Sequence, residues 1–493
     1  MCRLAPRPII RGAVGVVACG HPLAAGCAHE AFARGGGAVD AAIAAAAALS
    51  VVLPDACGLG GDAMALVRQS DGEVRAYNGS GAAPAGMRTP VPVDGGGTVA
   101  VPGCVAAWQD LHRDYGKLAL AELLAPAVAL ARGGFALGSD LVAVLNTHRD
   151  RLGRWAKDWW TSTELSPGVL VRQPRLADTL ERIGAEGADA FYRGELAEAL
   201  AAAVRRAGGA MTSDDVRAHA TIIAKPVIAT FAGAQLALQP PVSQAVLAAM
   251  VLRHLDAAPT TDLDRTHAAI EFVEAAFGHR NEIASTDVDA LMALTFDYDP
   301  RRALRRGGPR GYSHTAAVTT ADANGCLVSM LVSIFDDFGS AVLVPEGGYL
   351  LNDRLLGFSG TTSNAPSPGA RPVHTLSPII VEQHDRVFAL ATPGADGQVQ
   401  LLVQLLDGLI REHAPIAEVL ARPRWLSLDG RVVLEAGFPR TLALSLARRG
   451  HEVVDESAGP SLFGAACVAG HDVLNGTLYA AMDPRREVWA AAV

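Results

Sequence analysis

The sequence predicts a layered α/β fold in which helices cover two β-sheets that face each other. Helical patterns dominate residues 20–300, and short, continuously apolar strand patterns dominate from residue 312 onward. Strands without a polar face are typical of sheets that are buried on both sides, and helices with one apolar face pack on such sheets. The chain has 493 residues, of which 50% are hydrophobic, so it can fill a large core.

The helices are predicted from apolar periodicity. The most apolar segment, 38–54, contains Asp40 and is too short to span a bilayer, so we expect a buried, alanine-rich helix there. In the segment 264–284, apolar residues such as Ile270 and Val273 recur at helical spacing, as expected for a helix that lies on a sheet. Further helices are predicted at 105–116, 119–134, 397–413 and 440–453.

The strands are predicted from runs of β-branched and apolar residues that end at turn residues. These runs are 63–69, 226–240, 315–322, 326–335, 341–351, 377–394 and 431–437. Gly58, Gly60 and Gly61 precede the first run. Because no Lys-Ser/Thr pair follows them and the chain then enters a strand, they predict a tight turn and not a nucleotide-binding loop.

Charge and cysteine content exclude several classes of protein. The formal net charge is −9 and no Lys/Arg run is long, which argues against a nucleic-acid partner; the most basic stretch, 301–310, is predicted to be a solvated loop. The seven cysteines form no CxxC pair and the 14 histidines no HExxH motif, so we expect no disulfide framework, metal or cofactor. The N-terminus lacks the apolar core of a signal peptide, and we expect a cytoplasmic protein without a membrane partner.

Thr315 begins a predicted β-hairpin. The sequence TAAVTTADANGCLVSMLVS contains two strand runs joined at Asn324-Gly325, a pair that is typical of a type I′ turn. With these two residues at the centre of the turn, Thr315 lies opposite Ile334, whereas a one-residue bulge brings it opposite Ser333. In either register, Ser333 is the nearest polar side chain on the partner strand.

A threonine at this position has two interpretations. Most such threonines are ordinary β-branched strand residues. If the bond between His314 and Thr315 were cleaved, however, Thr315 would carry both a nucleophilic hydroxyl and its own base, the α-amine. An α-amine has a pKa of about 7.7–8.0, so roughly a tenth of it is neutral at pH 7. The residues alone leave both interpretations open.

Several motifs resemble the gamma-glutamyltranspeptidase family of N-terminal-nucleophile hydrolases, in the right order from about residue 11 to the C-terminus. They include the alanine helix with its glycine turn and the segments VAVPGCVAAW, QPPVSQAVL, DANGCLVSM, RPVHTLSPIIV and TPGADGQVQ. The resemblance implies the fold of these hydrolases, which is a four-layer αββα sandwich of two stacked, mainly antiparallel sheets. It also implies that Thr315 is the nucleophile and that the chain cuts itself between His314 and Thr315.

The resemblance assigns further residues to the reaction. The family's threonine that hydrogen-bonds the nucleophile corresponds to Ser333. The family's glycine pair whose N–H groups form the oxyanion hole corresponds to Gly394 and Ala395. Alanine in place of the second glycine keeps the backbone N–H donor. The paired serines near the substrate correspond to His374 and Thr375, a variant that resembles acylase-like branches of the family. His374 could also be a packed loop histidine.

The residues that recognise a glutamyl head in the family are absent. The family's arginine falls near Ser80, its asparagine on Phe335 and its aspartate on Gly357. Each charge-assisted contact contributes about 1.5–3 kcal/mol, so we expect a free γ-glutamyl head to bind poorly.

The acidic and basic residues close to these positions have two interpretations. Arg354 and Asp353 could supply a different polar contact to the substrate or form a surface salt bridge. Asp336 and Asp337 are adjacent at the end of a strand, so their side chains point to opposite sides and are predicted to be solvated.

The leading hypothesis is a self-processing threonine hydrolase or acyltransferase that acts on an amide or related acyl bond of a small molecule, in secondary metabolism. Its segments 1–314 and 315–493 would remain together as a heterodimer and build one αββα domain. Three alternatives remain open: hydrolysis of a C–C bond beside an acyl group, as in relatives from antibiotic pathways; an unprocessed, non-catalytic binding protein; and ordinary transpeptidase activity, which the lost glutamyl contacts disfavour.

Overall fold

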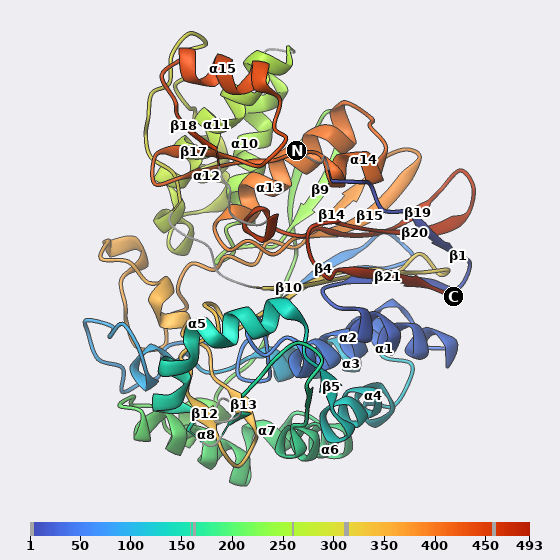
Figure 1. The fold of residues 1–493 in the computed structure, drawn as a ribbon, viewed down its shortest axis with the longest axis vertical. Helices are drawn as coiled ribbons and strands as arrows, with labels where there is room; N and C mark the ends of the chain where they lie inside the picture. The colour runs from blue at the N-terminus through green and yellow to red at the C-terminus, as the bar shows by residue number, and fades with distance from the viewer. Residues whose placement is uncertain (1–3, 158, 161–163, 259–260, 310–314, 456–459) are drawn as a thin grey trace.

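Two seven-stranded sheets form the centre of the molecule in the part of the chain that the computed structural model describes, which is residues 4–157, 159–160, 164–258, 261–309, 315–455 and 460–493 (Figure 1). The first sheet has the order β1 (Ile10–Gly12), β20 (Thr477–Met482), β19 (Cys467–Asp472), β15 (Arg386–Ala391), β14 (Ile379–Glu382), β9 (Ala234–Leu238), β8 (Val227–Phe231). The second has the order β21 (Trp489–Ala492), β2 (Gly15–Cys19), β10 (Ala316–Asp322), β11 (Leu327–Ser333), β3 (Asp62–Arg68), β4 (Val74–Gly79), β7 (Ile222–Ala224). Neighbouring strands in both sheets are antiparallel.

Helices cover the outer side of each sheet, below and above the strands in Figure 1. Those packed on the side of the second sheet are α1 (Pro22–Ala33), α2 (Ala38–Val52), α3 (Cys104–Tyr115), α4 (Leu120–Gly133), α5 (Ser139–Trp155), α6 (Pro174–Glu186), α7 (Asp189–Tyr192), α8 (Gly194–Arg206) and α9 (Ser213–Arg217). Those on the side of the first sheet are α10 (Ala245–Asp256), α11 (Asp262–Gly278), α12 (Val288–Ala293), α13 (Gly397–Leu406), α14 (Ile416–Ala421) and α15 (Arg440–Arg448). The predicted four-layer αββα sandwich is confirmed.

Short strands and helices lie outside the two main sheets, and some of their bounds differ from the predicted helices and strands. The run 341–351 forms two short strands, β12 (Leu343–Val344) and β13 (Tyr349–Leu350), because Gly347 and Gly348 turn the chain between them. The predicted helix 440–453 ends at Arg448, since Gly450 has a φ of 94° and redirects the chain into β18 (Glu452–Asp455). β18 pairs with β17 (Arg431–Leu434), which also pairs with β16 (Trp425–Leu428).

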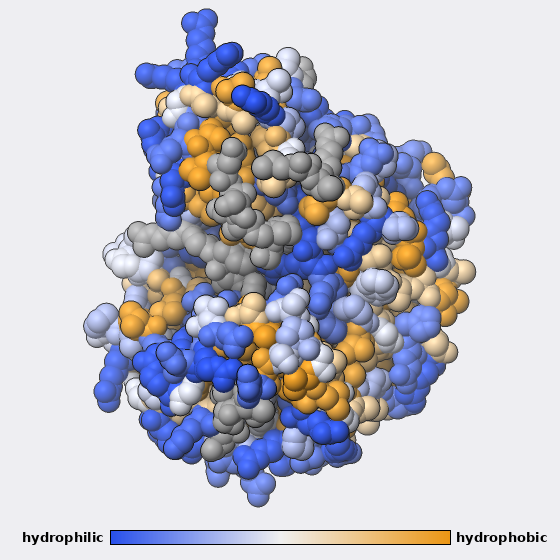
Figure 2. Space-filling view, viewed as in Figure 1, coloured by the Kyte–Doolittle hydropathy of each residue, from blue (hydrophilic) through white to orange (hydrophobic). Residues whose placement is uncertain are grey.

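The alanine-rich segment 38–54 forms a buried helix, as predicted. All 15 residues of α2 are buried, and α2 packs between the second sheet and α1, α3 and α4. Within the described ranges, no helix combines the length and the apolar character needed to cross a membrane. On the face seen in Figure 2, hydrophilic residues predominate and hydrophobic ones form separate patches.

A layer of mostly small side chains separates the two sheets. β10 and β11 of the second sheet pack against β15 and β19 of the first. Small side chains let packed sheets approach closely, and the alanines of this layer are Ala18, Ala76, Ala237, Ala317, Ala321, Ala389, Ala391, Ala465, Ala469, Ala480 and Ala490. Because side chains alternate along a strand, Thr315 faces the same layer as Ala317.

The β10–β11 hairpin adopts the bulged register. Ala316 pairs with Val332, which brings Thr315 opposite Ser333. The two-residue turn with Ile334 opposite Thr315 is therefore wrong: the loop spans residues 323–325, and Gly325 alone in it has a positive φ, of 83°.

The side chain of Asp322 explains this wider loop. Its Oδ1 accepts hydrogen bonds from the N–H groups of Asn324 (2.9 Å) and Cys326 (3.2 Å). Its Oδ2 accepts one from Ala38 (2.9 Å) at the start of α2. The loop is thus held by an Asx-type interaction and tied to the helix that packs beneath it.

Candidate active site

Thr315 directly precedes β10, on the inner side of the second sheet. Its side chain is buried, with 4% exposure, and its hydroxyl donates to Ser333 Oγ at 3.4 Å. The Ser333 oxygen also accepts the N–H of Phe335 at 3.0 Å. The predicted pair of hydroxyls is therefore present. His314, on the other side of the predicted cleavage site, lies outside the described residues.

The glycine turn before β3 positions Ser333. A Cβ on Gly61 would lie 2.2 Å from the carbonyl oxygen of Ser333, and one on Gly60 would lie 2.1 Å from that of Leu350. Only glycine permits such close approach of two backbones. The N–H of Gly61 donates to Gly58 O at 3.1 Å, which confirms the predicted tight turn. The turn brings its backbone against those of Ser333 and Leu350.

Thr315 forms part of the wall of a cavity of about 240 Å³. Apolar side chains make up much of the lining, and its charged and titratable residues are His21, Asp55, Asp140, Arg486 and Glu487. Burial lowers the pKa of His21 to about 4 and that of Arg486 to about 10, while burial and Asp140 raise the pKa of Glu487. Sequence reasoning missed these residues, because they come from distant segments and belong to no motif.

The predicted oxyanion turn borders the same cavity through Pro393. Gly394 has a φ of 139° and Ala395 a φ of 44°, which is strained backbone for an alanine. Among the residues that the structure describes, neither Gly394 N–H nor Ala395 N–H has an acceptor. The turn is held from behind by Gln244, whose Nε2 donates to Ala395 O at 2.9 Å. Backbone N–H groups without an acceptor can stabilise a developing oxyanion when they face it.

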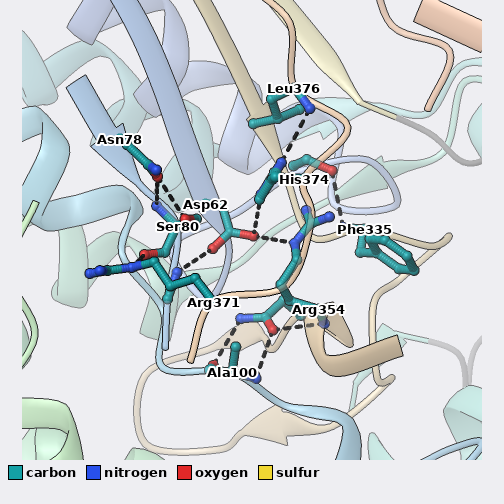
Figure 3. Close-up of polar contacts among 12 residues, drawn as sticks. Asp62, Asn78, Ser80, Ala100, Phe335, Arg354, Arg371, His374 and Leu376 are labelled. Carbon is teal, nitrogen blue, oxygen red and sulfur yellow. Dashed lines mark hydrogen bonds and ion pairs between the residues drawn. The ribbon is translucent and has the colours of Figure 1, made fainter. Parts of the chain in front are cut away.

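A buried polar network lies on the other side of Ser333 (Figure 3). Asp62, the first residue of β3, pairs with Ser333 across the sheet. Its Oδ2 accepts hydrogen bonds from Arg354 Nε (2.7 Å) and His374 Nε2 (3.2 Å), and its Oδ1 accepts the N–H of Gly81 (3.1 Å). The side chains of Asp62, Arg354 and His374 have no exposure. The interpretation of Arg354 as part of a surface salt bridge is wrong.

Burial and the positive charge of Arg354 determine the ionisation states of Asp62 and His374. Burial alone would raise the pKa of Asp62, but the charge of Arg354 and the bond from His374 hold it at about 2. Burial and Arg354 lower the pKa of His374 to about 4. Because the N–H of Leu376 donates to His374 Nδ1 at 3.2 Å, the proton of the neutral ring resides on Nε2. His374 is not among the residues that line the Thr315 cavity.

The buried Asp353 and the partly exposed Asp336 form a second acidic group beside Ser333. The N–H of Asp336 donates to Asp353 Oδ1 at 3.1 Å, and Arg151 Nη2 lies 3.6 Å from Asp353 Oδ2. Burial and Asp336 raise the pKa of Asp353 to about 8, and burial and Asp337 raise that of Asp336. Asp353 has no exposure, so the interpretation of Asp353 as part of a surface salt bridge is wrong, whereas Asp336 and Asp337, which were predicted to be solvated, are partly exposed.

The remaining predicted pocket residues make contacts within the protein. Ser80 Oγ donates to Asn78 Oδ1 at 2.6 Å. Gly357 ends a 3₁₀ turn, and a Cβ there would lie 3.1 Å from the carbonyl of Val373. Thr375 is buried and its carbonyl accepts Gln244 Nε2 at 3.2 Å.

Phe335 lies against the guanidinium group of Arg354. Its ring, which is partly exposed, lies 4.5 Å from Arg354 Cζ, and its φ of 83° is unusual for a bulky residue.

One group of potential metal ligands occurs in the described residues, away from Thr315: His267, Glu271 and His451. His267 and Glu271 are separated by one turn of α11. His267 Nδ1 lies 2.8 Å from His451 Nε2, and His267 Nε2 lies 2.9 Å from Asp299 O. Glu271 accepts Arg306 Nη1 at 3.1 Å, which ties the basic loop 301–309 to α11. Hydrogen bonds therefore satisfy all three side chains.

Comparisons with known proteins agree with this architecture. The family model for gamma-glutamyltranspeptidase matches residues 24–493. The oxamate amidohydrolase proenzyme of Klebsiella pneumoniae is 31% identical, covering 97% of this chain and 98% of that protein. The acylase ACY 1 proenzyme of a Pseudomonas species is 30% identical, covering 90% and 88%.

A solved structure shows the same fold throughout. The crystal structure of cephalosporin acylase from Bacillus halodurans superimposes with a TM-score of 0.92 and 29% identity, covering 99% of this chain and 97% of that one. The match extends over the sheets, the helices on both sides and the β10–β11 hairpin. The chain therefore belongs to the gamma-glutamyltranspeptidase family of N-terminal-nucleophile hydrolases and is an enzyme of that family.

Proposed function

We propose that this chain is a proenzyme that cuts itself before Thr315 and then hydrolyses an amide bond with Thr315 as nucleophile. The observation that carries the proposal is the placement of Thr315. Its hydroxyl contacts Ser333 Oγ, and Thr315 borders a cavity that is also lined by Pro393. Pro393 directly precedes Gly394 and Ala395, whose N–H groups have no acceptor among the described residues. Relatives named as proenzymes support self-cleavage.

The same residues would serve both reactions. In the precursor, Thr315 Oγ attacks the carbonyl carbon of His314, the bond from that carbon to Thr315 N breaks, and water hydrolyses the resulting ester. In the mature enzyme the α-amine of Thr315 takes the hydroxyl proton as Oγ attacks the substrate carbonyl. The N–H groups of Gly394 and Ala395 stabilise the oxyanion. The α-ammonium group then passes that proton to the leaving amine of the substrate, which departs. Water hydrolyses the acyl ester that remains on Thr315.

The bond attacked is best described as an amide. The names of the relatives point to amide or acyl bonds: one acts on oxamate and the others are acylases. A free γ-glutamyl head is disfavoured, since Ser80 and Gly357 are engaged in packing and Phe335 carries no polar group for the head. Release of ammonia or an amine during turnover separates amide hydrolysis from C–C bond cleavage.

Mass spectrometry under denaturing conditions tests the nucleophile. The wild type is expected to give two fragments, residues 1–314 and 315–493, whereas Thr315→Ala gives one intact chain. Thr319→Ala is the matched control: Thr319 is a buried threonine of the same strand whose hydroxyl donates to Ala18 O at 3.3 Å, and this variant should be cut normally. A wild type that stays intact after prolonged incubation contradicts the proposal.

A further inference from the structure

Arg354 is a buried arginine that uses only part of its hydrogen-bonding capacity. Its Nε donates to Asp62 Oδ2 at 2.7 Å. Its Nη1 and Nη2 are both buried, and neither has a hydrogen-bond partner among the described residues. The side chain has no exposure, so solvent does not satisfy these donors in the structure.

Unsatisfied donors on a buried cation are unfavourable unless something else binds them. An unpaired buried polar group costs about 1–3 kcal/mol, and more when it is charged. The two Nη groups form a planar fork whose geometry matches the two oxygens of a carboxylate. Lysine, asparagine or glutamine could not present such a fork. A carboxylate is therefore the ligand that this part of Arg354 fits.

The fork is held in place from two sides. Asp62 fixes the Nε edge and is itself held by His374 and by the N–H of Gly81. In Figure 3 the guanidinium lies between His374 and Phe335. The partly exposed Phe335 ring covers it, with Arg354 Cζ 4.5 Å from the ring centre. Rotation of that ring would uncover the face of the guanidinium on which it lies.

Arg354 is linked to the nucleophile through Phe335 and Ser333. Phe335, which covers the guanidinium, donates its N–H to Ser333 Oγ at 3.0 Å, and Ser333 accepts the Thr315 hydroxyl at 3.4 Å. Only the width of Phe335 and Ser333 therefore separates the fork from Thr315. A small acyl group that binds both would place its carbonyl at Thr315 and a second functional group at Arg354.

The charged groups around the fork leave it free for an anion. Asp62 is already bound to Nε and to His374, whose ring is neutral at pH 7 because its pKa is about 4. Asp353 and Asp336 lie nearby, but Asp353 Oδ1 is taken by the N–H of Asp336 and its Oδ2 lies beside Arg151. The pKa of Asp353, about 8, also keeps most of that carboxyl protonated at pH 7.

We propose that Arg354 determines substrate specificity by binding a carboxylate on the acyl part of the substrate through its two Nη groups. The inference rests on the proposed function, because it assumes that Thr315 attacks the same acyl group. The substrate class is then an amide whose acyl group carries a second, ionised carboxyl group, such as a monoamide of a short dicarboxylic acid.

Matched amide pairs test the proposal. Oxamate, malonamate, succinamate and glutaramate each have a neutral counterpart, the corresponding diamide, with the same carbon chain. We expect the cleaved wild type to release ammonia from at least one monoamide with a kcat/KM about 100-fold above that of its diamide, as two charge-assisted bonds would give. Equal rates for every pair would overturn the proposal.

Replacing Arg354, with Arg371 as a control, tests whether the preference for monoamides over diamides depends on the Arg354 side chain. Arg354→Lys keeps the positive charge but loses the fork, and it should reduce the monoamide preference to tenfold or less, mainly through KM. Arg371→Lys is the control: Arg371 Nε donates to Ser80 O (2.8 Å) and its Nη2 to Ala220 O (3.0 Å), so the preference should persist. A preference that survives in Arg354→Lys would overturn the proposal; if that variant does not fold, the wild-type ratio decides.

Calorimetry separates failure of this inference from failure of the proposed function. If the chain is not cut, or is cut but hydrolyses no amide in the panel, oxalate, malonate, succinate and glutarate are titrated into the wild type. Binding of one dianion, with at least tenfold weaker binding by Arg354→Lys, would support the Arg354 site although the reaction is different. Absence of binding by all four would overturn it.

Discussion

Ser333 is the residue on which the geometry at Thr315 most depends. Its oxygen accepts hydrogen bonds from the Thr315 hydroxyl and from the N–H of Phe335. It therefore fixes the rotamer of the threonine and the start of the strained segment that carries Phe335. One hydroxyl thus links the proposed nucleophile to the residue that covers Arg354.

Replacing this hydroxyl should slow self-cleavage without unfolding the chain. Ser333→Ala removes an oriented partner of Thr315 and leaves the Phe335 N–H unpaired, so we expect a rate of chain cleavage about tenfold or more lower and a stability loss of about 1–2 kcal/mol. The rate is followed by intact mass over time.

Ser329→Ala provides the comparison. Ser329 is also buried in β11, and its hydroxyl donates to Leu390 O at 2.8 Å, away from Thr315. The stability cost should be similar and the cleavage rate unchanged. Equal cleavage rates for both variants would show that Ser333 acts only in packing.

At the scale of elements, the site depends on how closely β3 and the turn before it approach β11. Gly60 and Gly61 bring the backbone against Leu350 and Ser333. β3 then pairs with β11 along its full length, which places Asp62 beside Ser333. The glycine turn is therefore an element of the site although it supplies no side chain.

A methyl group at this turn should disrupt the site in a position-specific way. In Gly61→Ala the new Cβ would lie 2.2 Å from Ser333 O and 2.9 Å from Ile334 Cγ2, so strands β3 and β11 must separate. We expect a loss of about 3 kcal/mol in the free energy of unfolding and impaired chain cleavage. Denaturant unfolding and intact mass report the two effects.

Gly58→Ala is the control within the same turn, since a Cβ there meets nothing within 4 Å. It should change the free energy of unfolding by no more than about 0.5 kcal/mol. If Gly61→Ala behaved like Gly58→Ala, the close approach would not matter for the site.

At the scale of the whole molecule, the segments before and after Thr315 are interleaved. The first sheet takes β1, β8 and β9 from before that residue, and the second takes β10, β11 and β21 from after it. Separating the two segments would expose both sheets and the alanine layer between them. We therefore infer that cleavage before Thr315 would leave one folded unit of two chains.

Buried histidines throughout the molecule make its stability depend on pH. His21, His219, His374 and His451 each have a pKa lowered to about 4, mainly by burial. The unfolded chain binds a proton at each near pH 6.5, whereas the folded chain binds it only near pH 4. Each histidine therefore contributes stability that is present above about pH 6.5 and is lost as the pH falls toward 4.

His374→Gln tests the sign and size of one such contribution. The wild type should lose stability relative to this variant by about 1.4 kcal/mol for each pH unit between about 6.5 and 4, because glutamine cannot be protonated. Urea unfolding at pH 7, 6, 5 and 4 measures the difference. A difference that stays constant over this range would mean that His374 is not held neutral by burial.

Local patterns in the sequence determined most of the elements, whereas the proposed nucleophile was named from the resemblance of ordered motifs to a known family. The alanine run predicted α2, the glycine turn was predicted before β3, and the hairpin was predicted around Asn324-Gly325. These features follow from side-chain periodicity and turn chemistry, which act over a few residues. Ser333 could be named as the polar neighbour of Thr315 for the same reason.

Only the tertiary structure decided the register and the polar network. The side chain of Asp322, bound to the start of α2, selected the wider hairpin loop. Asp62, Arg354 and His374 meet although 292 and 312 positions separate the bonded pairs. Arg354 could be interpreted as a surface residue from the sequence, since charged residues are usually exposed. Its burial, and the two Nη groups left without a partner, arise only when three distant segments are packed together.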